Sequence, residues 1–197
     1  KYMGIMGIEA IYPHKKKSTS AKNSQHKVHS YLLDKYWSSS GGTRTVCVPN
    51  SNEVWSGDIT YIRMSGGFMY LAAIIDWHSK AILSYKLSNS MDTSLVTDVL
   101  QEALGKYPAP KIFNSDQGSQ YASHDYQRLL KRYGLIGSMS RKGNCWDNAV
   151  AERFFLNLKM ERVWQRSYAN QLEAEKDIAQ YIAGYYNCIR LHSACGY

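Results

Sequence analysis

Three short segments with the pattern of β-strands follow one another closely between residues 54 and 87. They are "VWSGDITYI", "FMYLAAIID" and "AILSYKL", each rich in β-branched and aromatic residues. The first two are separated by a stretch that contains "SGG", which predicts a tight turn. Parallel neighbours need a crossover of a dozen or more residues, so these short connections predict three antiparallel strands.

The next part of the chain alternates helix and strand patterns. Asp92 or Thr93 is suited to cap a helix whose apolar residues follow the 3.6-residue period and which ends before Pro108. "KIFNSD" then predicts a fourth strand, "SHDYQRLLKRYG" a helix that ends at Gly134, and "LIGSMS" a fifth strand. This order predicts an α/β fold, a mixed five-stranded sheet with helices over both faces, as in ribonuclease H-like domains.

Two further helices are expected after the fifth strand. Asp147 is a suitable N-cap for a helix over residues 148–163, and the apolar spacing near the C-terminus predicts a long helix from about Tyr168 to Arg190. A short helix is also expected over residues 26–37.

The positive charge of the chain is concentrated near its N-terminus. Residues 1–45 hold eight Lys or Arg against two acidic residues, a net charge of +6 out of +8 for the whole chain. We therefore divide the chain into a basic arm or linker, residues 1–50, and a folded core, residues 51–197. A basic arm favours a polyanionic partner, nucleic acid before membrane, although a solvated leader with no partner explains the charge equally well.

Four cysteines without a C-x-x-C pair indicate a reducing, cytoplasmic setting. The longest apolar run, "FMYLAAII", is far shorter than a membrane-spanning helix.

Three carboxylates stand out, each with an ordinary alternative. Asp58 lies in the middle of a predicted strand, where Asp is uncommon, but it could face solvent. Asp116 follows a strand at its carboxyl end, or serves an Asx-turn in "NSDQGS". Gly118, two residues on, allows a backbone conformation forbidden to other residues and close approach of a substrate. Glu152 lies in a helix, where exposed glutamates are common.

Together the three carboxylates predict a metal site. If the fourth strand lies beside the first, Asp58 and Asp116 meet near the centre of the sheet, within reach of Glu152. Three carboxylates would repel one another, and Mg²⁺ or Mn²⁺ relieves that repulsion with hard oxygen ligands. Two such ions can clamp the attacking and leaving oxygens in phosphoryl transfer.

The blocks "VWSGDITYI", "IFNSDQGSQY" and "NCWDNAVAERFFLNLKMERVW" resemble the signature blocks of insertion-sequence family three transposases (OrfB type), relatives of retroviral integrases. Between Asp116 and Glu152 lie 35 residues, the spacing of the D,D(35)E triad of this group. The resemblance extends from about Trp55 to Tyr197. It implies a ribonuclease H-like integrase core in which Asp58, Asp116 and Glu152 are the catalytic residues and bind two Mg²⁺ or Mn²⁺ ions.

The resemblance also implies contacts with DNA. Lys159, two helical turns after Glu152, matches a basic position thought to contact DNA near the scissile phosphate, although it could be a solvated lysine. Arg141 and Lys142 lie in a segment similar to a mobile active-site loop and are expected to hold a DNA phosphate or to face solvent. The cationic residues of the preceding helix, Arg128, Lys131 and Arg132, are expected to form its solvated face.

The resemblance implies a transposase that cleaves and joins DNA in the bacterial cytoplasm, in association with the nucleoid. Its expected partners are transposon ends, target DNA and further copies of the chain. A helix-turn-helix region upstream in complete members is missing here. The alternatives are a metal-dependent nuclease of the same fold, which would hydrolyse DNA without joining it, and an inactive remnant that only binds DNA.

Overall fold

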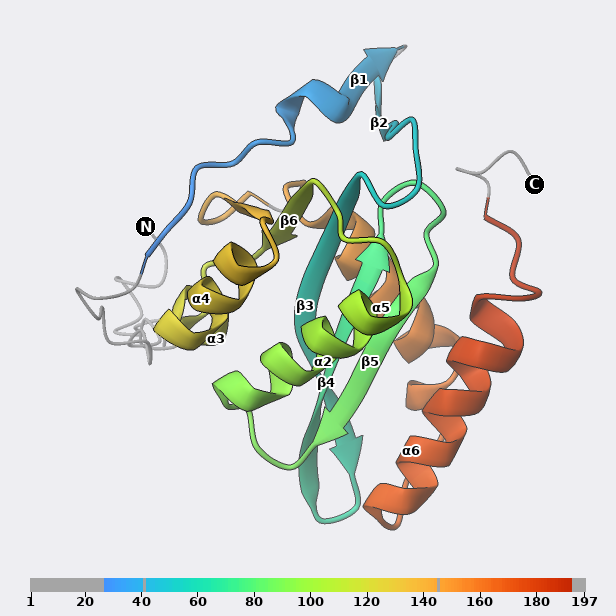
Figure 1. Ribbon diagram of the computed structural model, residues 1–197. Coiled ribbons are helices and arrows are strands. Elements are labelled where there is room, and N and C mark those ends of the chain that lie inside the picture. Colours follow the sequence, from blue (N-terminus) through green and yellow to red (C-terminus); the bar gives the residue numbers. More distant parts are fainter. Residues whose placement is uncertain (1–26, 41, 145, 193–197) are drawn as a thin grey trace, which may run out of the picture.

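A mixed five-stranded sheet forms the centre of the computed structural model, which describes residues 27–40, 42–144 and 146–192 (Figure 1). Its strands, in the order in which they lie side by side, are β5 (Ile82–Ser88), β4 (Gly67–Asp76), β3 (Val54–Met64), β6 (Ile112–Ser115) and β7 (Ile136–Met139). Strands β3, β4 and β5 pair antiparallel, and β6 and β7 continue the sheet parallel to β3. The predicted strands, their directions and the fold class are confirmed.

Local signals explain the two kinds of pairing. The hairpin of β3 and β4 closes at the pair Met64–Gly67, and Gly67 has a φ of +147°, which a side chain would disfavour. The parallel strand β6 is reached through helix α2 (Thr93–Lys106). Asp92 caps this helix, as expected, by accepting a hydrogen bond from the Leu95 backbone N–H at 3.2 Å.

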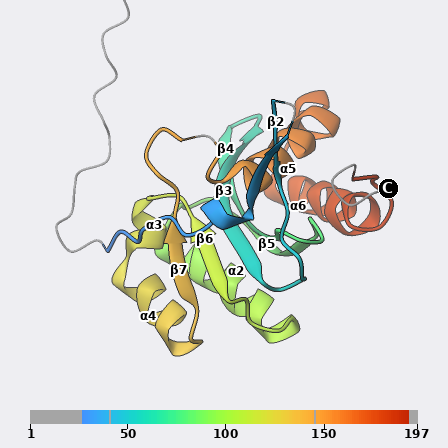
Figure 2. The ribbon, with the colours of Figure 1, turned by 90° about the horizontal axis from the view of Figure 1, so that it is seen from above.

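Helices cover both faces of the sheet, and each face has its own apolar core (Figure 2). On one face, α2 packs beside α3 (Ser119–Ala122) and α4 (His124–Arg132). The other face is covered by α5 (Ala149–Glu161) and α6 (Gln171–Ala179). The sheet therefore separates the helix that carries Glu152 from α2 and α4.

Three helix predictions differ from the structure. Helix α5 begins at Ala149 with Asn148 at the N-cap position, so the predicted capping role of Asp147 is wrong. The predicted last helix is divided into α6 and a π-helical segment, η3 (Gln180–Tyr186). Of the short helix expected over residues 26–37, the described part contains only one 3₁₀ turn, η1 (Asp34–Tyr36).

Part of the predicted arm packs on the core. A small hairpin of β1 (Trp37–Ser40) and β2 (Thr43–Val46) follows η1. Elsewhere in the chain, a 3₁₀ turn, η2 (Val163–Gln165), connects α5 to α6. Leu33 and Tyr36 are buried in the same apolar core as strand β3. The basic residues before position 27 lie outside the described residues, and the division at residue 50 stays a prediction. Nowhere in the described part of the chain is there a helix long and apolar enough to cross a membrane.

Candidate active site

The pairing of β3 with β6 brings Asp58 and Asp116 to neighbouring positions. The two parallel strands are in register at Val54–Ile112, Trp55–Phe113 and Ser56–Asn114. Asp58 lies two residues beyond Ser56, and Asp116 lies two residues beyond Asn114. Since side chains alternate between the faces of a strand, both aspartates continue the row of Ser56 and Asn114 on one face. Asp116 occupies the first position after β6, at its carboxyl end.

Helix α5 carries the third carboxylate on that same face of the sheet. Its buried residues pack into the apolar core on this side; they are Val150, Ala151, Phe154, Phe155 and Leu158. Glu152 lies in the first turn, and Lys159 follows seven residues later, about two turns along the helix. Both side chains act electrostatically on the Asp58 carboxyl. The predicted triad and Lys159 are therefore electrostatic neighbours.

The surroundings of the carboxylates disfavour negative charge. Burial raises the pKa of Asp58 to about 7, and the charges of Asp116 and Glu152 act in the same direction. A hydrogen bond of 2.8 Å from the Ile59 backbone N–H and the charge of Lys159 only partly offset this.

The other two carboxyls show the same tendency more weakly. Asp116 is exposed as a residue, yet desolvation of its carboxyl still raises its pKa, against a hydrogen bond of 2.9 Å from the Gly118 N–H. Partial desolvation also raises the pKa of Glu152. An additional cation would stabilise all three in the ionised form.

The chemistry of this donor set fits a hard divalent cation. Across the residues that the structure describes, no group of three or more His, Cys, Asp or Glu side chains is close enough together to hold a metal ion. The three neighbours nevertheless offer only carboxylate oxygens, the ligands that Mg²⁺ and Mn²⁺ prefer, and their mutual repulsion is the kind that such an ion relieves.

Two glycines close to the aspartates in the sequence have no space for a side chain. A Cβ atom on Gly57 would lie 2.8 Å from Cζ of Phe113, and one on Gly118 would lie 2.9 Å from Oδ1 of Asp116. The φ of Gly118 is −59°, so the residue does not use the backbone conformations that only glycine allows. Its glycine instead leaves space for the Asp116 carboxylate.

A buried polar network beside the site is absent from the sequence prediction. Asn114 of β6 donates hydrogen bonds to the backbone oxygen of Asp147 at 3.0 Å and to Ser140 Oγ at 3.3 Å, and it accepts one from Ser138 Oγ at 2.9 Å. The network joins β6 and β7 to the segment just before α5. A buried Asn inside an apolar strand is the sequence signal that could have indicated it.

Arg141 is held by two carboxylates, and about half of its side chain is exposed. Its Nε and Nη2 donate to Asp147 at 2.8 and 2.9 Å, its backbone N–H donates to the same carboxylate at 2.8 Å, and Nη2 also reaches Asp34 at 3.1 Å. The guanidinium carbon lies 4.7 Å from the centre of the Tyr31 ring. Lys142 is exposed. DNA contact by Arg141 or Lys142 stays a prediction.

Comparisons with known proteins agree with this fold. Two family models described as integrase core domain match residues 49–145 and 133–197. The transposase InsF for insertion sequence IS3A of Escherichia coli (strain K12) is 43% identical over 147 residues, which is 74% of this chain and 51% of that protein. The chain thus spans about half the length of this relative.

Solved structures with low sequence identity share the fold. An intasome of simian T-cell lymphotropic virus, solved in complex with PP2A regulatory subunit B56 gamma, matches with a TM-score of 0.64 at 18% identity, over 88% of this chain and 57% of that one. The HTLV-2 integrase catalytic core domain in complex with magnesium matches with a TM-score of 0.54 at 18% identity, over 73% of this chain and 92% of that one. With a ribonuclease H-like sheet and two integrase core models that together extend from residue 49 to residue 197, the chain belongs to the integrase core domain family.

Proposed function

We propose that this chain is the catalytic core of a DDE transposase, which cleaves DNA at the ends of an insertion sequence and joins those ends to a second DNA. The carrying observation is that Asp58 and Asp116 occupy matching positions on parallel strands, with Glu152 acting electrostatically on Asp58. Membership of the integrase core family and the 43% identity to a transposase support the same function.

Asp58, Asp116 and Glu152 would hold two Mg²⁺ or Mn²⁺ ions. Such ions, when bound, would supply Lewis-acid chemistry, which would polarise a phosphate and make a water or hydroxyl a better nucleophile. Backbone N–H groups of Ile59 and Gly118 fix the orientation of the two aspartates.

Lys159 has the position and charge to hold a DNA phosphate beside the carboxylates. It is half-buried and interacts with Asp58, and burial lowers the pKa of its ammonium. A DNA phosphate next to it would favour the charged ammonium and so oppose the effect of burial on its pKa. Its contribution would be to position the DNA strand, because a lysine supplies a charge and hydrogen bonds without taking part in bond cleavage.

The expected partners are transposon ends and target DNA, bound by more than one copy of the chain in the bacterial cytoplasm. Pairing two ends requires two active sites, which favours a homo-oligomer assembled on DNA. A DNA-reading region upstream of the core, as in complete members of the resembled family, would supply sequence specificity, because backbone contacts position DNA whereas base contacts specify it.

The test is a strand-transfer assay with labelled DNA that carries the ends of the insertion sequence. We would compare the wild-type chain with Asp116→Asn and with Asp98→Asn, a control that makes the same chemical change at a surface ion pair on α2. Nicking and joining that require Mg²⁺ or Mn²⁺, persist in Asp98→Asn and vanish in Asp116→Asn would support the proposal. Nicking without joining would favour a nuclease, and DNA binding without reaction in every variant would favour an inactive remnant.

Metal binding can be measured in the absence of DNA, from the thermal stability of the protein. A ligand that binds only the folded state adds about 2.7 kcal/mol of stability at a hundred times its Kd. We expect Mg²⁺ to raise the melting temperature of the wild type and of Asp98→Asn but not that of Asp116→Asn. Equal shifts in all three proteins would place the ion elsewhere.

A further inference from the structure

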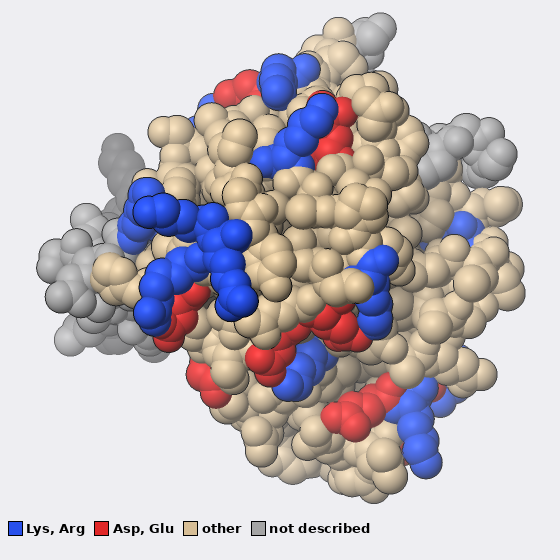
Figure 3. Space-filling model, in the orientation of Figure 1, with Lys and Arg blue, Asp and Glu red and all other residues tan. Residues whose placement is uncertain are grey.

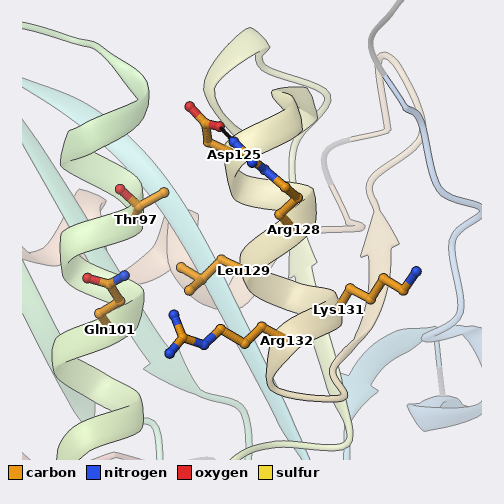
Figure 4. Close-up of a pocket in the computed structure, with 7 residues that line it drawn as sticks. All are labelled: Thr97, Gln101, Asp125, Arg128, Leu129, Lys131 and Arg132. Carbon is orange, nitrogen blue, oxygen red and sulfur yellow. Dashed lines mark hydrogen bonds and ion pairs between the residues drawn. The ribbon is translucent and has the colours of Figure 1, made fainter.

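A groove with a cationic wall lies between α2 and α4, on the face of the sheet opposite α5 (Figure 4). Its volume is about 740 Å³. The lining residues are Thr97 and Gln101 from α2, and Asp125, Arg128, Leu129, Lys131 and Arg132 from α4. In Figure 4 the side chain of Arg132 reaches across the groove toward Gln101, whereas Lys131 points away from α2.

The cations of this groove outnumber their counterions. Lys131 and Arg132 lie three and four residues after Arg128, so each of them lies close enough to repel the Arg128 guanidinium. Arg128 forms an ion pair with Asp125. Lys131 and Arg132 are exposed, and no side-chain hydrogen bond or ion pair joins either of them to another residue in the described ranges. The charge on α4 is therefore available to an external anion.

The same charge extends over the other side of α4. A second hollow of about 340 Å³ shares Arg128 and Lys131 with the first, and Lys27 and His124 also line it. The space-filling view shows Lys and Arg gathered over α4 (Figure 3). The two hollows and the ridge of α4 between them form one surface, which we call the α4 basic band.

We propose that the α4 basic band binds the phosphodiester backbone of a duplex DNA segment distinct from the segment at the Asp58 site of the same molecule. The inference rests on the proposed function, because it assigns a second surface to the same class of partner. The sheet lies between this band and α5, so one phosphate cannot contact both Lys159 and Arg132.

The composition of the groove favours DNA backbone over a protein partner. Of the seven lining residues that Figure 4 labels, only Leu129 is apolar, whereas protein interfaces have an apolar centre. Gln101 on the facing wall offers an amide donor, a group that commonly binds phosphate oxygens alongside Arg and Lys. Exposed cations of this kind bind phosphates independently of base sequence.

The test measures binding of a labelled linear duplex by fluorescence anisotropy across a salt series, in EDTA so that cleavage does not interfere. Each phosphate contact contributes about 0.9 to the slope of log affinity against log salt concentration. For Lys131→Ala/Arg132→Ala we expect a slope reduced by about 1.8 and an affinity at low salt reduced about tenfold. The matched control is Arg63→Ala/Lys176→Ala, which removes two exposed cations from β3 and α6.

An unchanged slope in Lys131→Ala/Arg132→Ala, or an equal reduction in the control, would overturn the inference. A change in oligomeric state at unchanged DNA affinity would also overturn it and would indicate a second copy as the occupant. Circular dichroism and urea unfolding check that both double variants fold. If the wild type carries out strand transfer and the salt slope of Lys131→Ala/Arg132→Ala is unchanged, only the inference about the α4 basic band is refuted. If the slope of the double variant is reduced but the wild type carries out no strand transfer, only the proposed function is refuted. Absence of DNA binding by the wild type would refute both.

Discussion

Asp177 anchors the C-terminal end of the helix that carries Glu152 and Lys159. Its carboxylate, 6% exposed, accepts hydrogen bonds from Arg162 Nε at 2.9 and 3.0 Å and from the Tyr168 hydroxyl at 2.7 Å. Arg166 Nη1 lies 2.8 Å from the same carboxylate. Arg162 is the C-cap residue of α5, so Asp177 on α6 fixes the end of α5 through it.

We predict that Asp177→Ala destabilises the protein by about 3–5 kcal/mol, because it leaves two guanidinium groups and a fully buried tyrosine without their shared acceptor. Tyr168→Phe should cost less, about 1.5–3 kcal/mol, the usual range for a hydrogen bond to a charged group. In the double variant the second change removes a hydroxyl that has already lost its acceptor. The two effects should therefore fall short of additive by about 2 kcal/mol.

Urea unfolding of the wild type, the two single variants and the double variant measures this coupling. Asp98→Asn, at an exposed ion pair, is the control and should change the free energy of unfolding by no more than about 1 kcal/mol. Additive effects, or a loss below about 1 kcal/mol for Asp177→Ala, would refute the idea that this buried network holds α5 in place.

Three further predictions follow from contacts around the site. Arg141→Ala should lower the urea midpoint without changing the salt slope of DNA binding, because its guanidinium is held by carboxylates; the opposite pattern would make it a DNA contact. Hydrogen bonds from Arg190 hold the pKa of Glu161 below its ordinary 4.5, so Glu161→Gln should destabilise the protein at pH 7 by an amount that shrinks as the pH falls through the folded pKa. A difference that stays constant down to pH 3 would contradict this explanation. Gly57→Ala should cost about 1–3 kcal/mol of stability, since its Cβ would lie 2.8 Å from Cζ of Phe113, and a neutral result in urea unfolding would mean that the ring moves freely.

Local sequence signals predicted the sheet and the neighbourhood of Asp58 and Asp116. Strand patterns, short connections and the cap at Asp92 act over a few residues, and the structure contains all of them. Once β6 is known to pair with β3, the neighbourhood of Asp58 and Asp116 follows from the register alone.

Contacts between distant segments could not be predicted in this way. Asp147 has the chemistry of an N-cap, but Arg141 occupies its carboxylate, and this pairing depends on how the loop folds back. Asp177 resembles any exposed acid of an amphipathic helix until Arg162 and Tyr168 are seen around it. In each case the role of the aspartate depends on a residue that only the tertiary structure places beside it, so the sequence alone cannot distinguish between the possible roles.

The groove beside α4 is a further feature that could not be predicted from the sequence. A solvated face was expected for Arg128, Lys131 and Arg132, and the structure agrees that they are exposed. The groove beside them exists because α2 packs next to α4, which no periodicity of α4 alone can indicate.

The packing of residues 29–36 has a consequence for the order in which the protein folds. The backbone N–H of Leu32 donates to Ser138 Oγ across a separation of 106 residues, and His29 contacts Gln127 across 98 residues. Closing such loops costs more entropy than forming the neighbouring hairpins, so β3, β4 and β5 can assemble before this segment finds its place. Its contacts should form late in folding and open early in unfolding, so its amide protons should exchange with solvent before those of the central strands.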